Sequence, residues 1–467
     1  MNKDMRLLRY FGLLMGLSLS TPVVFAEAEV KVNGFVNAGS LISDVEQVGY
    51  RDVSSAGGVL VIRNNSKRPL YDSSIGSRAN FDYPSLLGVQ VESKFNDKWS
   101  AVGQLVSTGL NDYKTEAEWL FAKYQANDKL NFRAGRLRFP AFLMSEYLKV
   151  GYAYPWITPP RNVYVQIPNG LANFTGVDFT YNTVAMNQDL GFSMFTGGSD
   201  TEITAPGNEK ITLQSRRALG GNLTFGNEKL SVRGGYACGN FTFKTLPTPV
   251  QMIKNFMNGG VVAATAVSPL LAPVQTHYAS AGSLGQGGYP SLATYLDIQN
   301  KWGNFWGVGY KLDWNNVYSL GEFTRRRIAG WLPDTYGWYA TLGYRVTEQL
   351  LPTLTYSQYR VTSMHKLNAI PTELNATAFT ATAPTSPAPN VASVLEAYKL
   401  ALQGLKDYYY TAEDTCILGV KYDIADGVAL KANYNRVMPK KGTQGLFDTR
   451  PAKRHVNIYG LAVNVVF

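Results

Sequence analysis

The chain has 467 residues, of which 44 are Lys or Arg and 34 are Asp or Glu, giving a formal net charge of +10. Charged residues make up only 17% and aromatic residues 13% of the chain, whereas soluble domains carry about 25% charged residues. The basic residues are scattered along the whole sequence, which disfavours a nucleic-acid-binding surface. A low charge with many aromatic residues is typical of a membrane barrel, which needs aromatic girdles and a polar interior.

The first 26 residues read as a secretory signal. Lys3, Arg6 and Arg9 form a basic start, an apolar stretch spans 11–19, and a small-residue cleavage site ends near Ala26. The apolar stretch is too short to span a bilayer as a helix, and no later segment approaches twenty apolar residues. Because no linker or change in composition divides residues 27–467, we expect them to form a single domain.

From residue 29 onward, short segments alternate apolar and polar residues, which is the pattern of strands with one face in an apolar environment. We predict about sixteen strands: 29–41, 86–95, 99–106, 116–125, 130–136, 174–181, 190–196, 216–225, 230–240, 306–314, 317–326, 336–346, 350–359, 415–423, 428–436 and 455–467.

Tight polar turns and long loops alternate between these strands. The long segments are 42–74, 138–170, 241–300 and 362–414, and the last of them contains a helical periodicity from Val391 to Lys406. An even strand number with short turns at one end and long loops at the other is typical of bacterial outer-membrane barrels.

The phase of the alternation predicts a wet interior. Trp306, Val308 and Tyr310 alternate with small residues and with Lys311 and Asp313, so the charged members of the strand point inward. A solid core would not tolerate many such charges, whereas a sixteen-stranded barrel is wide enough for an aqueous channel. This pattern therefore predicts a pore.

The last strand places Tyr459, Leu461, Val463, Val465 and Phe467 on one face. An exposed apolar edge invites aggregation in a soluble protein, whereas the last strand of a barrel closes on the first. The pattern also resembles the C-terminal signal by which outer-membrane barrels are recognised for assembly. A core strand of a soluble sandwich is the alternative interpretation of this segment taken alone.

The most distinctive sequence lies between the fifth and sixth predicted strands. Gly135-Arg136 ends a strand, Tyr152-Ala153-Tyr154-Pro155-Trp156 follows in the loop, and a strand resumes at Asn173. Together with the terminal Phe467, this segment resembles the Gram-negative general porin family. The resemblance implies a homotrimer of sixteen-stranded barrels in the outer membrane, with the third loop folded inward to narrow the pore. Membrane lipids, lipopolysaccharide and the barrel-assembly machinery are its expected partners.

In that family the inward loop faces a basic cluster on the wall. By strand phase, the expected inward-facing basic residues are Lys31, Arg78, Arg133, Arg216 and Arg233. The resemblance adds Arg136, although the alternation places this side chain outward unless Gly135 bulges. Glu146 is the only carboxylate between 138 and 170, and we expect it opposite the basic cluster.

The loop aromatics and the net charge give two weaker indications. Tyr152, Tyr154 and Trp156 either form an aromatic slide for sugars or, more commonly, wedge the loop against the wall. After residue 26 the net charge is +8 of the total +10, and a positive pore concentrates anions. We therefore expect a mild anion preference. Arg326 is the one member of the Arg325–Arg327 run expected to face inward.

Nothing in the sequence indicates enzymatic chemistry. His277, His365 and His455 have no metal-ligand spacing, and we expect no cofactor, metal or nucleic acid. The favoured function is passive diffusion of small hydrophilic solutes. The alternatives are a channel selective for phosphate, carboxylates or sugars, and a non-conducting structural or adhesive barrel. Cys238 and Cys416 lie about five strands apart and are expected to be free thiols.

Overall fold

The computed structural model describes residues 29–45, 81–109, 113–167, 172–205, 209–246, 293–364, 409–447 and 451–467, with short pieces between them at 48–49, 74–75, 79, 250–251, 254–255, 287–288, 380–381, 399–400, 402–403 and 406–407. The predicted secretory signal, Arg78, His277, His365 and most of the predicted helix at 391–406 lie outside the described residues.

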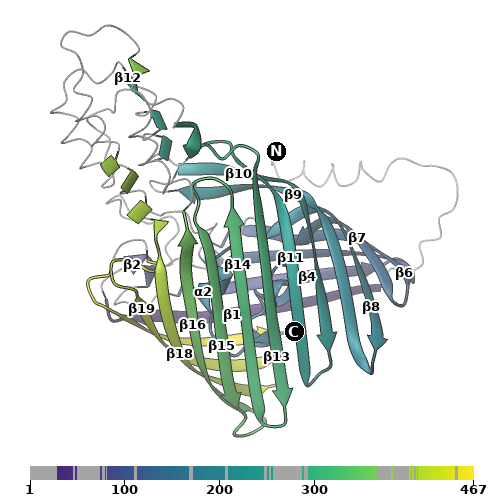
Figure 1. The fold of residues 1–467 in the computed structure, drawn as a ribbon. Helices are drawn as coiled ribbons and strands as arrows, with labels where there is room; N and C mark the ends of the chain where they lie inside the picture. Colours follow the sequence, from purple (N-terminus) through teal and green to yellow (C-terminus); the bar gives the residue numbers. More distant parts are fainter. Residues whose placement is uncertain are drawn as a thin grey trace, which may run out of the picture.

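Sixteen antiparallel strands form one closed barrel, in which each strand pairs with its neighbours along the chain (Figure 1). They are β1 (Glu29–Ser43), β4 (Leu86–Lys94), β5 (Trp99–Thr108), β6 (Thr115–Asn127), β7 (Leu130–Arg138), β8 (Asn173–Ala185), β9 (Gln188–Ala205), β10 (Glu209–Gly226), β11 (Leu230–Phe243), β13 (Lys301–Trp314), β14 (Val317–Ile328), β15 (Asp334–Tyr344), β16 (Leu350–Ser363), β18 (Ala412–Ala425), β19 (Val428–Pro439) and β20 (Val456–Val466). The predicted barrel of sixteen strands is confirmed, and most strands extend further toward the long loops than predicted. Two small pairs, β2 (Val48–Gly49) with β3 (Ser74–Ile75) and β12 (Gly287–Gly288) with β17 (Thr380–Ala381), form separate sheets.

The short turns share one local device. In three of them an asparagine side chain, that of Asn96, Asn127 or Asn227, accepts hydrogen bonds from the backbone N–H groups two and three residues later. Asparagine favours such turns because its short amide side chain replaces a backbone acceptor. These turns fix the register of the flanking strands, so the alternation of inward and outward side chains is set locally.

The last strand closes the barrel on the first. β20 runs antiparallel to β1 from Val466 opposite Phe35 to Ile458 opposite Ser43. Gly34 and Phe467 exchange two backbone hydrogen bonds of 2.7 and 3.0 Å. The closure leaves neither β1 nor β20 as a free edge, as the sequence of the last strand predicted.

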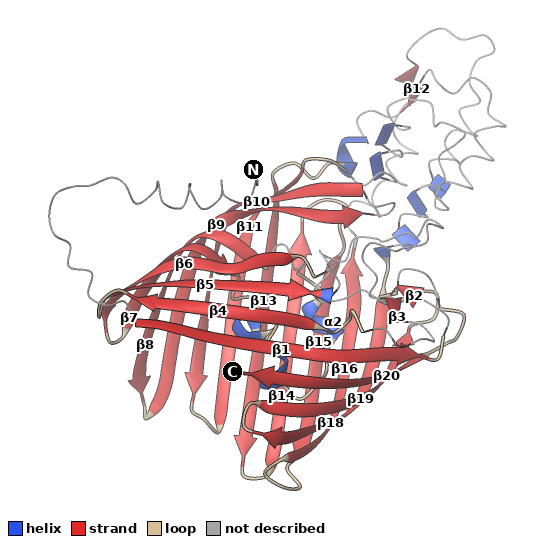
Figure 2. Ribbon diagram, turned by 180° about the vertical axis from the view of Figure 1, so that it is seen from behind, coloured by secondary structure: helices blue, strands red, loops and turns tan. Residues whose placement is uncertain are grey.

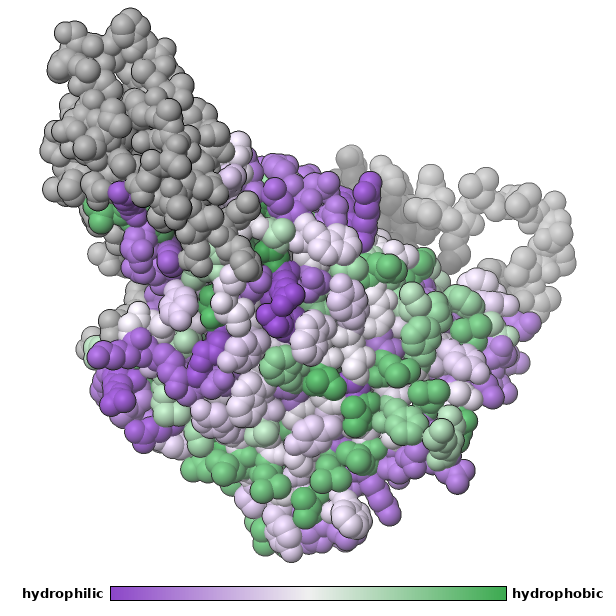
Figure 3. All heavy atoms as spheres, viewed as in Figure 1, coloured by the Kyte–Doolittle hydropathy of each residue, from purple (hydrophilic) through white to green (hydrophobic). Residues whose placement is uncertain are grey.

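The outer face of the barrel is apolar and exposed. Leu461 on β20 and Phe467 just after it are 69% and 66% exposed, and Tyr459 and Val463 point the same way. Figure 3 shows apolar residues gathered over the strands and hydrophilic residues along the upper rim. Cys238 and Cys416 are free, as predicted, and pair in register with the outward-facing Leu219 and Tyr356. In the described part of the chain no helix has the length and apolar character to cross a bilayer.

The ring of Phe467 lies directly over Gly34, where an added Cβ would approach a ring carbon to 2.3 Å. We expect Gly34→Val to push the ring off the closing strand pair and to lower the stability of the barrel by about 1 kcal/mol. Samples are incubated at increasing temperatures and then run on a denaturing gel, on which the folded barrel migrates faster than the unfolded chain. The temperature at which the fast-migrating band disappears measures the change in stability. Gly234→Val is the matched control, because a Cβ at Gly234 meets no atom within 4 Å. Equal losses in the two variants would contradict the predicted role of the Gly34–Phe467 contact.

Candidate functional site: the inner loop and the cavity beside it

The loop between β7 and β8 turns into the barrel; we call its described part, residues 139–167, the inner loop. It contains the short helices η3 (Ser145–Tyr147), η4 (Gly151–Ala153) and α2 (Arg161–Tyr164). η4 contacts β1 and β20, whereas α2 contacts β14, β15, β16 and β18. The loop therefore crosses the lumen to the opposite wall, and Figure 2 shows its helices within the ring of strands. The predicted inward third loop is confirmed.

Aromatic side chains pack the inner loop against the wall. Trp156 is fully buried, donates its indole N–H to Thr355 Oγ1 at 2.8 Å and meets the ring of Tyr339 edge-on. Tyr154 is 4% exposed. Tyr152 is only partly buried, and its ring lies 4.3 Å from Lys421 Nζ. Tyr154 and Trp156 thus wedge the loop in place, and their burial is incompatible with the aromatic slide.

Lys431 on β19 fastens the middle of the inner loop. Lys431 is 2% exposed, and its ammonium group donates to the backbone carbonyls of Gly151, Tyr154 (2.6 Å) and Trp156 (2.9 Å). An ammonium group has three donors, and an irregular backbone inside a protein leaves carbonyls in need of donors. One buried cation therefore satisfies three otherwise unmatched acceptors and holds this turn of the loop together.

Glu322 on β14 fastens the two ends of the inner loop. One carboxylate oxygen accepts from the Leu143 backbone N–H at 2.8 Å, and the other accepts from the Tyr164 hydroxyl at 2.7 Å. Gln166 adds a further tie by donating to Thr324 Oγ1 at 2.5 Å. Segments about twenty residues apart in the loop are thereby bound to a single strand.

A buried cluster around Glu118 on β6 fastens the inner loop on the side of the barrel where the loop begins. The Glu118 carboxylate accepts from Arg138 at 3.0 Å, from Asn173 at 3.0 Å and from Lys149. Glu118 lies at a bulge in β6, where the register against β5 shifts. Because Lys149 belongs to the loop, this ion pair extends the fastening to the near side. The inner loop is thus held at both walls, as a fixed constriction requires.

A polar cavity of about 490 Å³, the turn-side cavity, lies between the inner loop and the short-turn half of β7–β11. The loop contributes Pro140 and Glu146 to its lining, and the strands contribute mainly polar side chains such as Asn182, Asn222 and Thr224. Two arginines project into it, Arg133 from β7 and Arg233 from β11. This cavity is the candidate functional site.

Both arginines of the turn-side cavity are paired with carboxylates. Arg233 donates to both oxygens of Glu146 at 2.9 Å, and Arg133 donates to both oxygens of Asp178 at 2.9 and 2.5 Å. Burial raises the pKa of Glu146, but the Arg233 guanidinium outweighs this and holds the pKa below its ordinary range. Glu146 is therefore ionised at neutral pH and loses its charge only as the pH falls below the ordinary range of a glutamate.

Of the predicted constriction residues that the structure describes, it brings together only Arg133, Glu146 and Arg233. Lys31 has the inward phase, but it lies near the exposed start of β1 and pairs with Glu29 at 3.3 Å. Arg136 pairs in register with the outward Leu120 and donates to the Ala117 carbonyl at 2.7 Å. The resemblance-based placement of Arg136 in the constriction is wrong, because Gly135 causes no register shift between β6 and β7.

The inward placement of Arg216 is also wrong. Arg216 and Arg217 form a bulge in β10 that shifts the register against both neighbouring strands, and Arg217 adopts a φ of 52°. Because the bulge adds one residue, the inward and outward positions are exchanged in the part of β10 between the bulge and the long loop. Arg216 is consequently half-exposed on the outer face, where it donates to Asp200 at 2.7 Å.

Sequence reasoning missed several residues of the site. Asp178 on β8 lies in register opposite Arg133 on β7. Its inward phase in the strand alternation could have identified it as a partner of Arg133. Lys431 and Glu322 also occupy inward positions, but nothing local indicates that their partners lie in the inner loop. Within the described residues, no group of three His, Cys, Asp or Glu side chains is placed to hold a metal ion.

No family model matches the chain, and no curated protein matches it. Solved structures of similar fold include an anion-selective porin from Comamonas acidovorans (11% identity, TM-score 0.47, covering 94% of this chain and 100% of that one). Others are OmpT of Vibrio cholerae (11%, 0.46, 94% and 98%) and Salmonella typhi OmpF in complex with daunomycin (10%, 0.48, 94% and 98%). Such distant similarity says nothing about function.

The contacts of Lys431 predict that Lys431→Met loosens the inner loop. The three carbonyls lose a charged donor, and a hydrogen bond to a charged group is worth about 1.5–3 kcal/mol. We expect amide hydrogen exchange across residues 151–157 to accelerate about tenfold or more, with the barrel still folded. Lys311→Met is the control, since Lys311 lies exposed on the inward face of β13. Unchanged exchange in Lys431→Met would show that the loop is held without this cation.

Proposed function

We propose that this protein is an outer-membrane porin through which small hydrophilic solutes and ions diffuse passively. The observation that carries the proposal is the turn-side cavity, a polar space of about 490 Å³ inside a closed barrel whose outer face is apolar. Barrels of sixteen strands leave room for an aqueous passage. The inner loop narrows this passage, and the proposed activity is transport without chemistry.

We further propose that residues 1–26 direct secretion and that the barrel lies in a Gram-negative outer membrane with its short turns toward the periplasm. The exposed apolar face ending in Phe467 supports this location. The homotrimer, the contacts with lipopolysaccharide and membership of the general porin family are proposals that rest on the resemblance of the segment around Gly135-Arg136 and Tyr152–Trp156.

The proposed ion preference is mildly toward anions. It is supported by the net charge of the chain, +8 after residue 26, because positive charge along a passage concentrates anions. Arg133 and Arg233 are each neutralised by a carboxylate in the turn-side cavity. The preference must therefore come from charges outside these pairs, and we expect it to be weak.

Single-channel conductance of the purified full chain in planar bilayers, recorded under a salt gradient, tests the proposal. We expect stepwise conductance in groups of three and a reversal potential that favours chloride over potassium. A well-folded barrel that inserts without conducting would overturn the porin proposal and favour the structural or adhesive alternative. Saturable block by phosphate, a carboxylate or a sugar would favour the substrate-selective alternative.

Replacing Glu146 and replacing Arg233 are expected to change the ion selectivity in opposite directions, because each substitution leaves the other charge of the pair uncompensated. Glu146→Gln leaves an uncompensated guanidinium, and one unit charge about 7 Å from an ion in water is worth about 0.6 kcal/mol, or roughly threefold in local ion concentration. We expect the chloride-to-potassium permeability ratio to rise up to about threefold in Glu146→Gln and to fall in Arg233→Gln. The reversal potential at low ionic strength measures both shifts.

The double variant Glu146→Gln/Arg233→Gln provides the control. It removes both charges of the pair, so its permeability ratio should return close to that of the unmodified barrel. Shifts of the same sign in both single variants would show that the loss of packing, and not the charge, determines selectivity at this site.

A further inference from the structure

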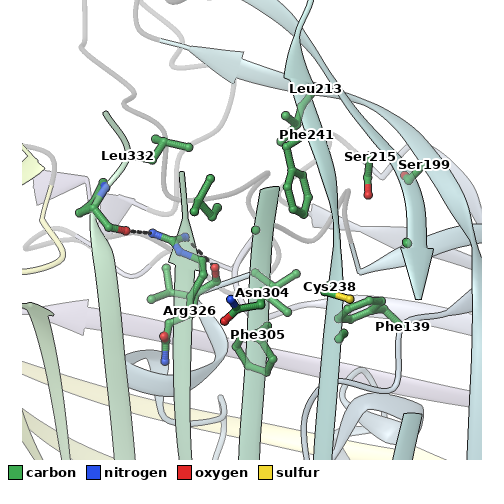
Figure 4. A pocket seen from close by; sticks show the side chains of 18 of the residues that line it. Phe139, Ser199, Leu213, Ser215, Cys238, Phe241, Asn304, Phe305, Arg326 and Leu332 are labelled. Carbon is green, nitrogen blue, oxygen red and sulfur yellow. Dashed lines mark hydrogen bonds between the residues drawn. The ribbon is translucent and has the colours of Figure 1, made fainter. Parts of the chain in front are cut away.

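A second cavity lies on the other side of the inner loop, toward the long loops. This loop-side cavity has a volume of about 110 Å³. Phe139 at the start of the inner loop lines it, whereas the next residue, Pro140, lines the turn-side cavity. Figure 4 shows Phe139, Phe241 and Phe305 around the loop-side cavity. The inner loop thus separates two spaces inside one barrel.

The loop-side cavity is lined mainly by apolar side chains. Five phenylalanines contribute to it: Phe139, Phe174, Phe241, Phe243 and Phe305. The lining also contains aliphatic residues, including Ile328, Leu332 and Leu446. A passage for hydrated ions has no use for so many rings, because they offer water and ions no hydrogen bonds. Small-molecule sites, in contrast, are mostly apolar with a few polar groups that fix orientation.

The polar side chains of the loop-side cavity are a minority of its lining and come from separate elements. Ser199 and Ser215 lie opposite each other on β9 and β10, Tyr359 lies on β16, and Tyr409 and Thr411 precede β18. Arg326 on β14 faces inward, as predicted, and donates to the carbonyls of Gln166 (2.7 Å) and Pro333 (3.3 Å). The first hydrogen bond joins the end of the inner loop to the wall, and the second joins β14 to the segment before β15; both are drawn in Figure 4 and fix that side of the cavity.

Three phenylalanine rings form the floor of the loop-side cavity. The ring centroids of Phe139 and Phe174 each lie 5.0 Å from that of Phe195, and Phe195 lines the turn-side cavity. Phe139 meets Phe195 edge-on, an arrangement that adds about 0.5–1.5 kcal/mol beyond the buried area. The floor is therefore a packed aromatic layer between an apolar and a polar space.

The volume of the loop-side cavity limits its occupant to about one ring. An apolar cavity of about 150 Å³ in another protein stays dry and binds benzene. A sugar of similar size carries several hydroxyl groups, and burying each without a partner costs about 1–3 kcal/mol. Apolar side chains outnumber the polar ones in the lining, and Gln166 and Arg326 already hydrogen-bond to the protein, so the cavity does not satisfy all of these hydroxyl groups. An aromatic ring with a single hydrogen-bonding substituent matches both the volume and the lining.

We propose that the loop-side cavity is a binding subsite for small uncharged aromatic compounds. The ring packs among Phe139, Phe241 and Phe305, and the polar substituent meets the side chains of Ser199 or Ser215. The inference goes beyond the proposed diffusion function, because binding at this subsite does not require conduction. It also makes the inner loop part of a binding site, in addition to its narrowing of the passage.

The test uses crystals of the detergent-solubilised full chain soaked with 4-bromobenzamide, whose bromine is located by anomalous scattering. We expect a bromine peak inside the loop-side cavity of the unmodified protein. Ala237→Trp should abolish this peak, since Ala237 lines the cavity from the inward face of β11. Ser231→Trp is the matched control, because Ser231 lies on the same face of the same strand and lines the turn-side cavity. It should leave the peak unchanged.

A binding titration with the same probe keeps the inference open to refutation if Ala237→Trp does not fold. Ala218→Leu fills part of the same cavity with a smaller change, and we expect it to weaken binding about tenfold relative to the unmodified barrel, or about 1.4 kcal/mol. Bromine found only in the detergent belt or in the turn-side cavity would overturn the inference. Equal binding by the unmodified barrel and the filled variants would overturn it as well.

Conductance recorded on the same preparations separates this inference from the proposed function. A barrel that conducts ions but takes up no probe refutes the aromatic subsite and leaves the porin proposal intact. A barrel that binds the probe but does not conduct refutes passive diffusion and leaves the subsite intact.

Discussion

The whole structure depends on the closure of β20 onto β1. An open sheet of these strands would leave the outer edges of its first and last strands unpaired. Because the outer face is apolar, those edges would be prone to aggregate. The pairing from Phe35–Val466 to Ser43–Ile458 removes both edges at once. Closure with sixteen strands also fixes a wide interior. The chain must then either leave that interior open or bring another segment of itself into it.

The inner loop is this segment, and its backbone explains the buried charges of the wall. Irregular backbone away from water needs partners for its N–H and C=O groups. Lys431 supplies donors to three carbonyls, and Glu322 supplies an acceptor to the Leu143 N–H. A buried ionised group is costly unless it is fully hydrogen-bonded. Here the polar side chain and the irregular backbone satisfy each other's hydrogen-bonding groups, so these inward residues of the strands stabilise the loop.

The sequence predicted the barrel well because strand alternation and turn chemistry are local. All sixteen strands follow from a period of two and from turns such as Asn96-Asp97-Lys98. The same alternation failed at Arg216, where a bulge adds a residue that the pattern does not reveal. It also could not find the partners of Lys431, which lie about 275 residues away in the chain. The inward phase of Arg133 and Arg233 was predictable, whereas the exact pairing of their charges required the fold.

The two cavities imply that charge and apolar contact act at different places along the barrel. In the turn-side cavity Arg133 and Arg233 are each paired with a carboxylate, so in the proposed passage these two pairs would act on an ion as dipoles more than as net charges. On the loop side of Phe139, Phe174 and Phe195, a hydrated ion meets rings that cannot replace its water, which is how apolar constrictions resist ions. An aromatic solute loses little by leaving water at the same point. In the proposed passage, the cost of dehydration at the aromatic layer would therefore decide what enters this side of the barrel more than the net positive charge of the chain.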